Sequence, residues 1–493
     1  MGVDGLGVAR LDGKVYFVEG GLPGDKIKAL VFRDKGRYAQ ARMVEVLEPS
    51  EHRIEPLCPH FGYCGGCKWQ NLNYPTQLAY KSKQVYEALT RLGGLSLEEV
   101  VAEPALAAPA PYRFRNKLEF TFTARRWLLP QDFQAGSSEA PPGLPEAPEL
   151  HGTSEAPPGL PEAPGLPGTS EALPGLPGLG FHLSGRFERI LHIDSCYLMD
   201  EEVNLIRNTF YREAVSRGLT FYHPKTRQGY LRNLMVRNTK EGCWLVLLSV
   251  RDDNPELLKP YLLAVQNTVE QTLMPGSVQW LYTVNSKAND SLDGLEIEVF
   301  SGQNKLYESL DGLRFGISAT SFFQTNPRQA EAMYRQVRDW CGLSGQECVY
   351  DLYTGTGSIA LFLAPHAGKV VGVEYVASAV EDALQNALLN NIQNATFVAG
   401  DMAKILNTEF YLRHGYPEVV VVDPPRAGMH PEVVQTLLQS GASRIVYVSC
   451  NPATQARDLQ GLSEQYRLER YRPLDLFPQT AHIENLALLV RKE

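Results

Sequence analysis

The sequence lacks both a long hydrophobic run and a recognisable targeting signal. No stretch of about 18 consecutive apolar residues occurs, which argues against a transmembrane helix. The N-terminus, MGVDGLGVARLDG, does not have the charged and apolar regions of a secretory signal peptide. Leu6 also stands where an N-myristoylation motif requires Ser or Thr. We therefore expect a cytoplasmic protein that has no membrane partner.

An excess of basic charge is also missing. The 493 residues carry a net charge of −9, and the pI is about 5.7. Non-specific affinity for nucleic acid is therefore disfavoured, and any such binding would depend on local basic patches and on shape. With 44% hydrophobic and 21% charged residues, the chain is long enough for two or three globular domains.

Cysteine is scarce, but three of the eight cysteines lie close together in the sequence. Cys58, Cys64 and Cys67 stand among prolines and glycines in the segment CPHFGYCGGC, a pattern typical of a metal-binding loop in a reducing compartment. Such a loop needs a fourth thiolate, and Cys196 is the natural candidate. Four thiolates suit an iron–sulfur cluster or tetrahedral zinc, so the spacing alone leaves both possibilities open. The spacing differs from the CxxxCxxC loop of radical enzymes.

A glycine-rich turn follows a predicted strand in the segment VYDLYTGTGSIA, residues 349–360. Gly355 and Gly357 would let the backbone approach a ligand, and the helix expected after them presents unpaired N–H groups. Glu374 ends the next apolar run, where a carboxylate can bind ribose hydroxyls. The turn therefore predicts a nucleoside cofactor. Because Ala360 replaces the last glycine of a GxGxxG fingerprint, the turn alone leaves a dinucleotide oxidoreductase open.

Three further residues with reactive or charged side chains adjoin apolar runs. Asp423 follows VVVV, Cys450 follows RIVYVS, and Glu484 precedes NLALLV. In an open α/β sheet, ligands bind beyond the carboxyl ends of the strands, so Asp423 and Cys450 are expected at one edge. Each residue also has a purely structural interpretation: a small buried hydrophobe for Cys450, a strand cap for Asp423 and a solvated charge for Glu484.

The order of these motifs resembles that of the RNA uracil-5-methyltransferases, which use S-adenosylmethionine. The resemblance covers nearly the whole chain and rests on the segments GVARLDGKVYFVEGGLPGD, CPHFGYCGGCKWQ, YRFRNKLEF, SFFQTNP, DLYTGTG, DPPRAGMH, VSCNPAT and FPQTAHIE. It implies that Cys450 is the nucleophile and that Glu484 is the general base. The residues expected to bind the methyl donor are Gln324, Tyr353, Gly355, Glu374 and Asp423.

The implied chemistry starts from the low nucleophilicity of carbon 5 of uracil. Attack of the Cys450 thiolate on carbon 6 would generate an enolate, and carbon 5 could then take the methyl group. Glu484 would remove the proton from carbon 5 and so allow elimination of the cysteine. Arg426 is a candidate for stabilising the thiolate. The uridine would have to leave its stack to reach the thiol. Phe322, Phe323 and Tyr447 could stack on the base, but taken singly each is better explained as an aromatic residue of the hydrophobic core.

The chain is expected to fold into three domains. Residues 1–55 alternate apolar and polar residues between glycine turns and predict a TRAM-like RNA-binding β-barrel, with a first strand that is short or absent. Residues 56–340 predict a central α+β RNA-binding domain, which holds the cysteines and the basic, aromatic segment YRFRNKLEFTFT. Residues 341–493 alternate strands and helices. The expected fold class is therefore α/β, with a class I, Rossmann-like methyltransferase domain whose sheet is parallel and doubly wound.

A low-complexity insert interrupts the central domain at residues 135–180. A sixteen-residue period is visible at Ser138, Ser154 and Ser170. The insert contains no Lys, Arg or aromatic residue, and its proline and glycine content cannot build a core. We predict that it is a disordered loop and that its deletion leaves activity intact.

The resemblance favours one branch of the family. The ribosomal-RNA branch carries a 4Fe-4S cluster on four cysteines that match Cys58, Cys64, Cys67 and Cys196, whereas the tRNA branch typically lacks them. We therefore expect methylation of 23S rRNA by a monomer, with S-adenosylmethionine and a 4Fe-4S cluster as cofactors. Two alternatives stay open: a methyltransferase that acts on tRNA uridine or on cytosine, and a noncatalytic RNA-binding iron–sulfur protein.

Overall fold

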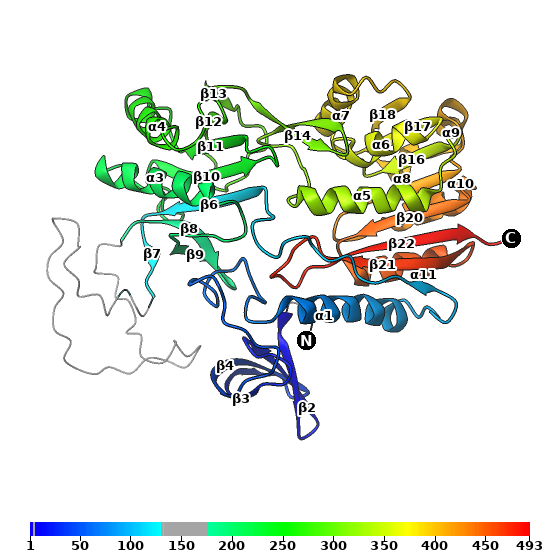
Figure 1. Ribbon diagram of the computed structural model, residues 1–493, viewed down its shortest axis with the longest axis horizontal. Coiled ribbons are helices and arrows are strands. Elements are labelled where there is room, and N and C mark those ends of the chain that lie inside the picture. The colour runs from blue at the N-terminus through cyan, green and yellow to red at the C-terminus, as the bar shows by residue number, and fades with distance from the viewer. Residues whose placement is uncertain (3–4, 130–131, 133–175) are drawn as a thin grey trace.

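A computed structural model describes residues 1–2, 5–129, 132 and 176–493 of the chain (Figure 1). The predicted insert lies outside the described residues as far as residue 175. Its last three residues belong to strand β8 (Gly178–Leu183), so the insert ends earlier than the sequence pattern indicates. No helix in the described ranges is both long enough and apolar enough to cross a bilayer.

The N-terminal strands form a four-stranded sheet in the order β1-β2-β4-β3. Its strands are β1 (Gly7–Leu11), β2 (Lys14–Glu19), β3 (Lys26–Asp34) and β4 (Tyr38–Glu48). Among the residues that the structure describes, no pairing joins the edge strands β1 and β3, so the closed barrel expected here is not formed. A barrel needs inward side chains to fill its interior, but the only buried hydrophobic side chains in these four strands are Val18, Ala39 and Ala41.

The central part of the chain forms an eight-stranded sheet covered by two helices. Its strands, in spatial order, are β13 (Glu298–Ser301), β12 (Val278–Val284), β11 (Trp244–Val250), β10 (Leu231–Asn238), β6 (Lys117–Thr123), β8, β9 (Arg186–His192) and β7 (Arg126–Trp127). The antiparallel neighbours β10 and β11 confirm the two strands predicted there. Helices α3 (Glu202–Ser216) and α4 (Pro255–Val269) cover the sheet, and Phe210, Tyr261 and Trp280 meet in the core between them.

The C-terminal part, called the catalytic part below after the role predicted for it, forms a second eight-stranded sheet. Its strands, in spatial order, are β18 (Ala395–Ala399), β17 (Lys369–Glu374), β16 (Cys348–Leu352), β19 (Val419–Val422), β20 (Arg444–Ser449), β22 (Glu484–Arg491), β21 (Tyr466–Leu474) and β5 (Val101–Ala102). The first five are parallel, whereas β22 runs antiparallel to both of its neighbours. The predicted α/β fold class is therefore confirmed.

Alternate residues of each strand enter two hydrophobic cores, one on each face of this sheet. Val419 and Val421 pack in one core, and Val420 and Val422 pack in the other. The first core contains residues of α5 (Pro327–Cys341), α6 (Ser358–Leu363) and α7 (Ala377–Leu389). The second contains residues of α1 (Tyr74–Glu87), η2 (Ala88–Leu92), α8 (Met402–Ile405), α9 (Thr408–His414), α10 (Pro431–Ser440) and α11 (Pro452–Leu462). A short helix, η3 (Ala364–His366), follows α6.

Segments from the range predicted as the central domain join the catalytic sheet. Strand β5 extends its edge beside β21, and α1 lies along the same region (Figure 1). The hairpin of β14 (Lys305–Leu310) and β15 (Leu313–Ser318) contributes Leu310, Phe315 and Ile317 to the core next to α5. Residues far upstream of 341 therefore help to shape the catalytic layer.

Candidate active site at the carboxyl edge of the catalytic sheet

The strand order reverses between β16 and β19, and this reversal locates the site. From β16 the chain proceeds outward through β17 and β18, and it then returns to β19 and β20 on the other side. Ligands of open α/β sheets bind in the crevice at such a reversal, beyond the carboxyl ends of the strands. The edge where β16, β17, β19 and β20 end is called the carboxyl edge below.

The glycine turn after β16 lies at this edge. Gly355 and Gly357 have φ angles of 56° and 81°, which glycine adopts without penalty. A Cβ atom on Gly357 would lie 2.9 Å from the Cβ of Ala383, whereas none of the described atoms lies within 4 Å of a Cβ on Gly355. Tyr353 also has a positive φ, 65°, and such strain in a non-glycine residue is concentrated at functional sites.

The Glu374 carboxylate at the end of β17 points back to the turn. One of its oxygens accepts a hydrogen bond from Gly355 N at 3.0 Å, and the other accepts from Val376 N at 2.9 Å. The turn and Glu374 therefore form one unit. Asp401 lies just beyond the end of neighbouring β18, so it comes to the same edge; the sequence analysis did not single it out.

Asp351 of β16 is a second acidic residue that the sequence analysis did not single out. It is fully buried, and Oδ2 accepts hydrogen bonds from Thr354 Oγ1 at 2.5 Å and from Ala360 N at 3.0 Å. Oδ1 has no hydrogen-bond partner among the described residues. Burial raises the pKa of Asp351 to about 7. Buried Tyr334 of α5 was also missed; burial and then the charge of Asp423 raise its pKa.

Gln324 lies in the segment before α5, which three hydrogen bonds hold in place. Arg237 Nη2 donates to Ser321 O at 3.1 Å, Asn116 N donates to Thr325 O at 2.8 Å, and Asn326 Nδ2 donates to Leu476 O at 3.0 Å. The first two donors belong to the central part of the chain, whereas Leu476 belongs to the loop before β22. Half-buried Gln324 is thus placed where the central and catalytic parts meet.

Of the three aromatic residues proposed to stack on a base, only Phe322 is available at the surface, with 70% of its area exposed. Phe323 and Tyr447 are 3% and 0% exposed, which agrees with their interpretation as core residues and excludes stacking on a base. Both side chains belong to hydrophobic cores, and the Tyr447 hydroxyl donates to Asp458 at 2.6 Å.

The register of the β20–β22 ladder brings Cys450 and Glu484 to the carboxyl edge together. The ladder ends at the pair Ser449–Asn485. Cys450, which directly follows β20, therefore stands opposite Glu484, the first residue of β22. Gln455 of α11 fixes this register, because its Nε2 donates to Tyr447 O at 3.1 Å and to Asn485 O at 3.2 Å. Two residues separated by more than thirty positions in sequence thus become neighbours.

The charge of Glu484 acts on the Cys450 thiol. Burial, and then the charges of Glu484 and Asp423, raise the pKa of the Cys450 thiol to about 11. Burial and the charge of Asp423 raise the pKa of Glu484 to about 8, and burial raises the pKa of Asp423 to about 7. The positive charge of Arg426 lowers the pKa of both Cys450 and Glu484 and so opposes these shifts in part. The cluster therefore combines a thiol, two acids that hold protons near neutral pH, and one exposed cation.

The four cysteines of the predicted metal loop lie within one another's electrostatic influence. Burial and then interactions that include the other thiols raise the pKa values of Cys64, Cys67 and Cys196 to about 11, 12 and 12. Cys58 is half-buried, and its charge acts on all three. Among the described residues no group of three or more Cys, His, Asp or Glu is arranged as a metal site, so the metal centre stays a prediction.

The strand order, the glycine turn and the acids at the ends of β16, β17 and β19 are those of a methyltransferase of the S-adenosylmethionine-dependent class. A family model described as tRNA (uracil-5-)-methyltransferase matches residues 312–492, and a TRAM domain model matches residues 2–44. A Bacteroides thetaiotaomicron protein named as an RNA methyltransferase is 40% identical and covers 99% of both chains. One from Chlorobaculum tepidum is 38% identical over 96% of this chain and 90% of the relative.

A solved structure agrees with these relatives. The Pyrococcus abyssi tRNA (uracil-54, C5)-methyltransferase, in complex with S-adenosyl-L-homocysteine, is similar with a TM-score of 0.70 and 25% identity, covering 99% of this chain and 100% of that one. The chain belongs to the RNA uracil-5-methyltransferase family. It is an enzyme whose methyl donor is S-adenosylmethionine and whose substrate is RNA.

Proposed function

We propose that the protein methylates carbon 5 of a uridine in 23S rRNA through a covalent bond between Cys450 and carbon 6 of the base. It would act as a monomer in the cytoplasm. The observation that carries this proposal is the juxtaposition of Cys450 and Glu484 at the carboxyl edge, next to the turn suited to a nucleoside. A nucleophile and a base are the two groups that this chemistry requires.

The methyl donor would bind along the carboxyl edge from the glycine turn to Asp423. Gly355 offers open space for a ligand, and the Glu374 carboxylate is suited to accept hydrogen bonds from ribose hydroxyls. The strained Tyr353, half-buried Gln324 and Asp423 complete the proposed binding residues. When bound, S-adenosylmethionine supplies an electrophilic methyl group.

Cys450 must first lose its proton, since a thiol with a pKa of about 11 is almost entirely protonated at neutral pH. Thiolate attack on carbon 6 forms a carbon–sulfur bond and breaks the 5,6 double bond, which leaves an enolate. Carbon 5 of the enolate would then take the methyl group as the bond from that methyl to the sulfonium sulfur breaks. Glu484 next accepts the proton of carbon 5, the carbon–sulfur bond breaks, and the double bond of the ring is restored. Because burial raises the pKa of Glu484 to about 8, its carboxylate is a stronger base than an exposed glutamate, and the fraction able to take this proton grows as the pH rises.

We assign a 4Fe-4S cluster to Cys58, Cys64, Cys67 and Cys196. The donor set fits, because a 4Fe-4S cluster is held by four cysteine thiolates. These four cysteines form no disulfide, and their thiols are near enough to affect one another's pKa. Bound there, the cluster would supply a cross-link between the loop of residues 58–67 and the segment after β9. Tetrahedral zinc is the alternative occupant.

The RNA substrate can be identified by mapping 5-methyluridine in ribosomal RNA and in tRNA from a strain that lacks the gene. Loss of one or more sites in 23S rRNA, restored by the wild-type protein and not by Cys450→Ala, is the expected result. A second candidate is tRNA, because the similar Pyrococcus abyssi enzyme is named for uracil 54 of tRNA. Loss of 5-methyluridine from tRNA alone would establish that candidate and reject the first.

A further inference from the structure

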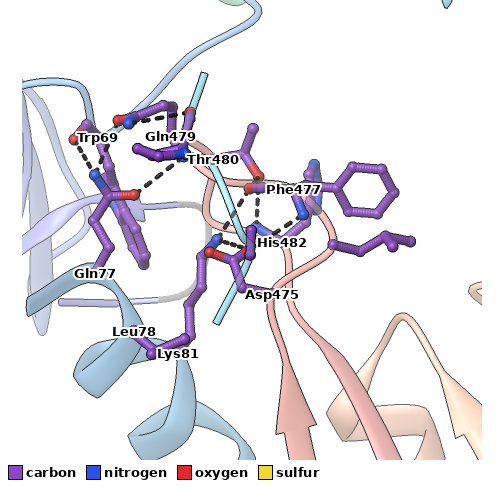
Figure 2. Close-up of polar contacts among 12 residues, drawn as sticks. Trp69, Gln77, Leu78, Lys81, Asp475, Phe477, Gln479, Thr480 and His482 are labelled. Carbon is purple, nitrogen blue, oxygen red and sulfur yellow. Dashed lines mark hydrogen bonds and ion pairs between the residues drawn. The ribbon is translucent and has the colours of Figure 1, made fainter. Parts of the chain in front are cut away.

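The loop of residues 475–483, which joins β21 to β22, ends directly before Glu484 and is unusually polar for a buried segment. Asp475 has no exposed area, and Gln479 is 3% exposed. Both side chains bind partners on helix α1, which lies about 400 positions earlier in the sequence (Figure 2). Buried polar contacts of this kind restrict a segment to one conformation. In this network Asp475 Oδ2 has no hydrogen-bond partner among the described residues.

Lys81 of α1 holds the start of the loop. Its Nζ lies 2.7 Å from Asp475 Oδ1, and both side chains are completely buried. The same ammonium donates to Phe477 O at 3.0 Å, while Asp475 Oδ1 also accepts from Phe477 N at 3.1 Å. One cation therefore fixes both ends of a three-residue stretch. Replacing a buried ion pair by apolar residues often leaves stability unchanged, so stability alone gives little reason for this pair.

Gln77, one helical turn before Lys81, holds the middle of the loop. Its Nε2 donates to Gln479 Oε1 at 2.9 Å, and its Oε1 accepts from Gln479 N at 3.1 Å. This paired amide contact fixes Gln479 at a φ of 66°, a strained conformation for a residue with a side chain. Lys68 N and Trp69 N, which follow the cysteine loop, both donate to Gln479 O, at 2.8 and 3.1 Å.

The loop also contacts the segment that carries Gln324, through the bond from Asn326 Nδ2 to Leu476 O. Its conformation is thus set by α1, by residues 68–69 and by the segment before α5. Glu484 depends on this conformation because it is the first residue of β22. Strand pairing holds the chain from Glu484 onward, whereas the loop alone holds the chain before it. Terminal residues of an element are held least firmly by the element itself.

We propose that Glu484 is positioned for removal of the carbon 5 proton by four residues, Gln77, Lys81, Asp475 and Gln479, which are called the hub below. These four are positioning residues, since they act through the loop and not on the substrate. The inference rests on the proposed function of Glu484 as the base. It assigns to α1 a role in the release of product that is separate from attack by Cys450 and from binding of the methyl donor.

The test uses Gln479→Gly in the full-length protein. Glycine accepts the positive φ, so the change removes the hydrogen bond from Gln77 Nε2 to Gln479 Oε1 and keeps the bond from the backbone N of residue 479, without adding strain. We expect S-adenosylmethionine affinity and methyl transfer in the first turnover to stay unchanged. Multiple turnover should fall on the order of 10²-fold, the scale of a misplacement by about 1 Å, and a denaturant-stable protein–RNA adduct should accumulate. Lys83→Met, at an exposed position of the same helix, is the matched control and should behave as wild type.

A double variant, Lys81→Met with Asp475→Leu, tests the other half of the hub without leaving a buried charge unpaired. It should accumulate the same adduct. Release at the wild-type rate in both Gln479→Gly and the double variant would overturn the proposal. Joint loss of cofactor affinity and first-turnover transfer would overturn it as well, because that result indicates a general structural role. Glu484→Gln, assayed in parallel, separates the two proposals: an adduct there but not in the hub variants rejects only the hub, whereas no adduct in Glu484→Gln rejects the assignment of the base on which both depend.

Discussion

Cys450 and Glu484 stand opposite each other just beyond the Ser449–Asn485 pair, where the antiparallel ladder of β20 and β22 ends. Burial raises the pKa of both groups, and the charge of Glu484 raises the pKa of Cys450 further, because two acidic groups repel each other's negative charge and cannot form an ion pair. The resting site therefore holds a protonated thiol beside a largely protonated acid. Both groups must therefore lose a proton before they act, the thiol before it attacks carbon 6 and the acid before it takes the proton of carbon 5.

Replacing the nucleophile should separate chemistry from binding. In Cys450→Ala we expect methyl transfer to RNA to fall by at least about 10³-fold, since removal of a nucleophile abolishes the covalent route. The affinity for S-adenosylmethionine should remain within experimental error, because the glycine turn and Glu374 are untouched. Isothermal titration calorimetry and incorporation of labelled methyl groups measure the two quantities. A variant that keeps its activity would exclude Cys450 from the reaction.

Removal of the Arg426 charge should make the thiol harder to ionise. Arg426 lowers the pKa of Cys450 against the effect of burial, so Arg426→Met should raise it further above about 11. The thiolate fraction at any pH below that value then falls, and alkylation of Cys450 by iodoacetamide should slow while keeping its increase with pH. Arg413→Met, at an exposed site on α9, is the control. Equal alkylation rates in wild type and Arg426→Met would show that the guanidinium has no such effect.

Much of the catalytic layer could be predicted from the sequence, because its information is local. The apolar runs that end at Asp423 and at Cys450 predict buried parallel strands, and the glycines at 355 and 357 predict the turn. The N-terminal barrel was predicted from the same alternation, but alternation cannot reveal whether edge strands meet. The opposition of Cys450 and Glu484 depends on β22 entering between β20 and β21, a choice among distant strands that no local pattern encodes.

The ion pair between Lys81 and Asp475 could not be predicted from the sequence either, because the two residues lie 394 positions apart. Its burial predicts an asymmetric response to mutation. Lys81→Met leaves a buried carboxylate without its cation and should lower the free energy of unfolding by about 3–5 kcal/mol. Adding Asp475→Leu should recover most of this loss, because the double variant has no unpaired buried charge. Urea denaturation of both variants measures the difference, and an equal loss in the two would refute the account of the pair.

The iron–sulfur cluster proposed for the four cysteines should be visible as a chromophore. Protein purified without oxygen should contain about four iron and about four sulfide per chain and should absorb broadly in the visible range. Cys196→Ser should lose most of this iron. Cys243→Ser should retain it, because Cys243 is not one of the four predicted ligands. A colourless protein with one zinc ion per chain would replace the iron–sulfur assignment by a tetrahedral zinc site.

The most direct test of the covalent mechanism is mass spectrometry of the adduct formed by Glu484→Gln with RNA and S-adenosylmethionine. Without the carboxylate the proton of carbon 5 should stay in place, and the enzyme should remain linked to a methylated base. The account predicts a peptide in which Cys450 carries a 5-methyl-5,6-dihydrouridine nucleotide through carbon 6. Release of 5-methyluridine at the wild-type rate, or a link through any other residue, would contradict it.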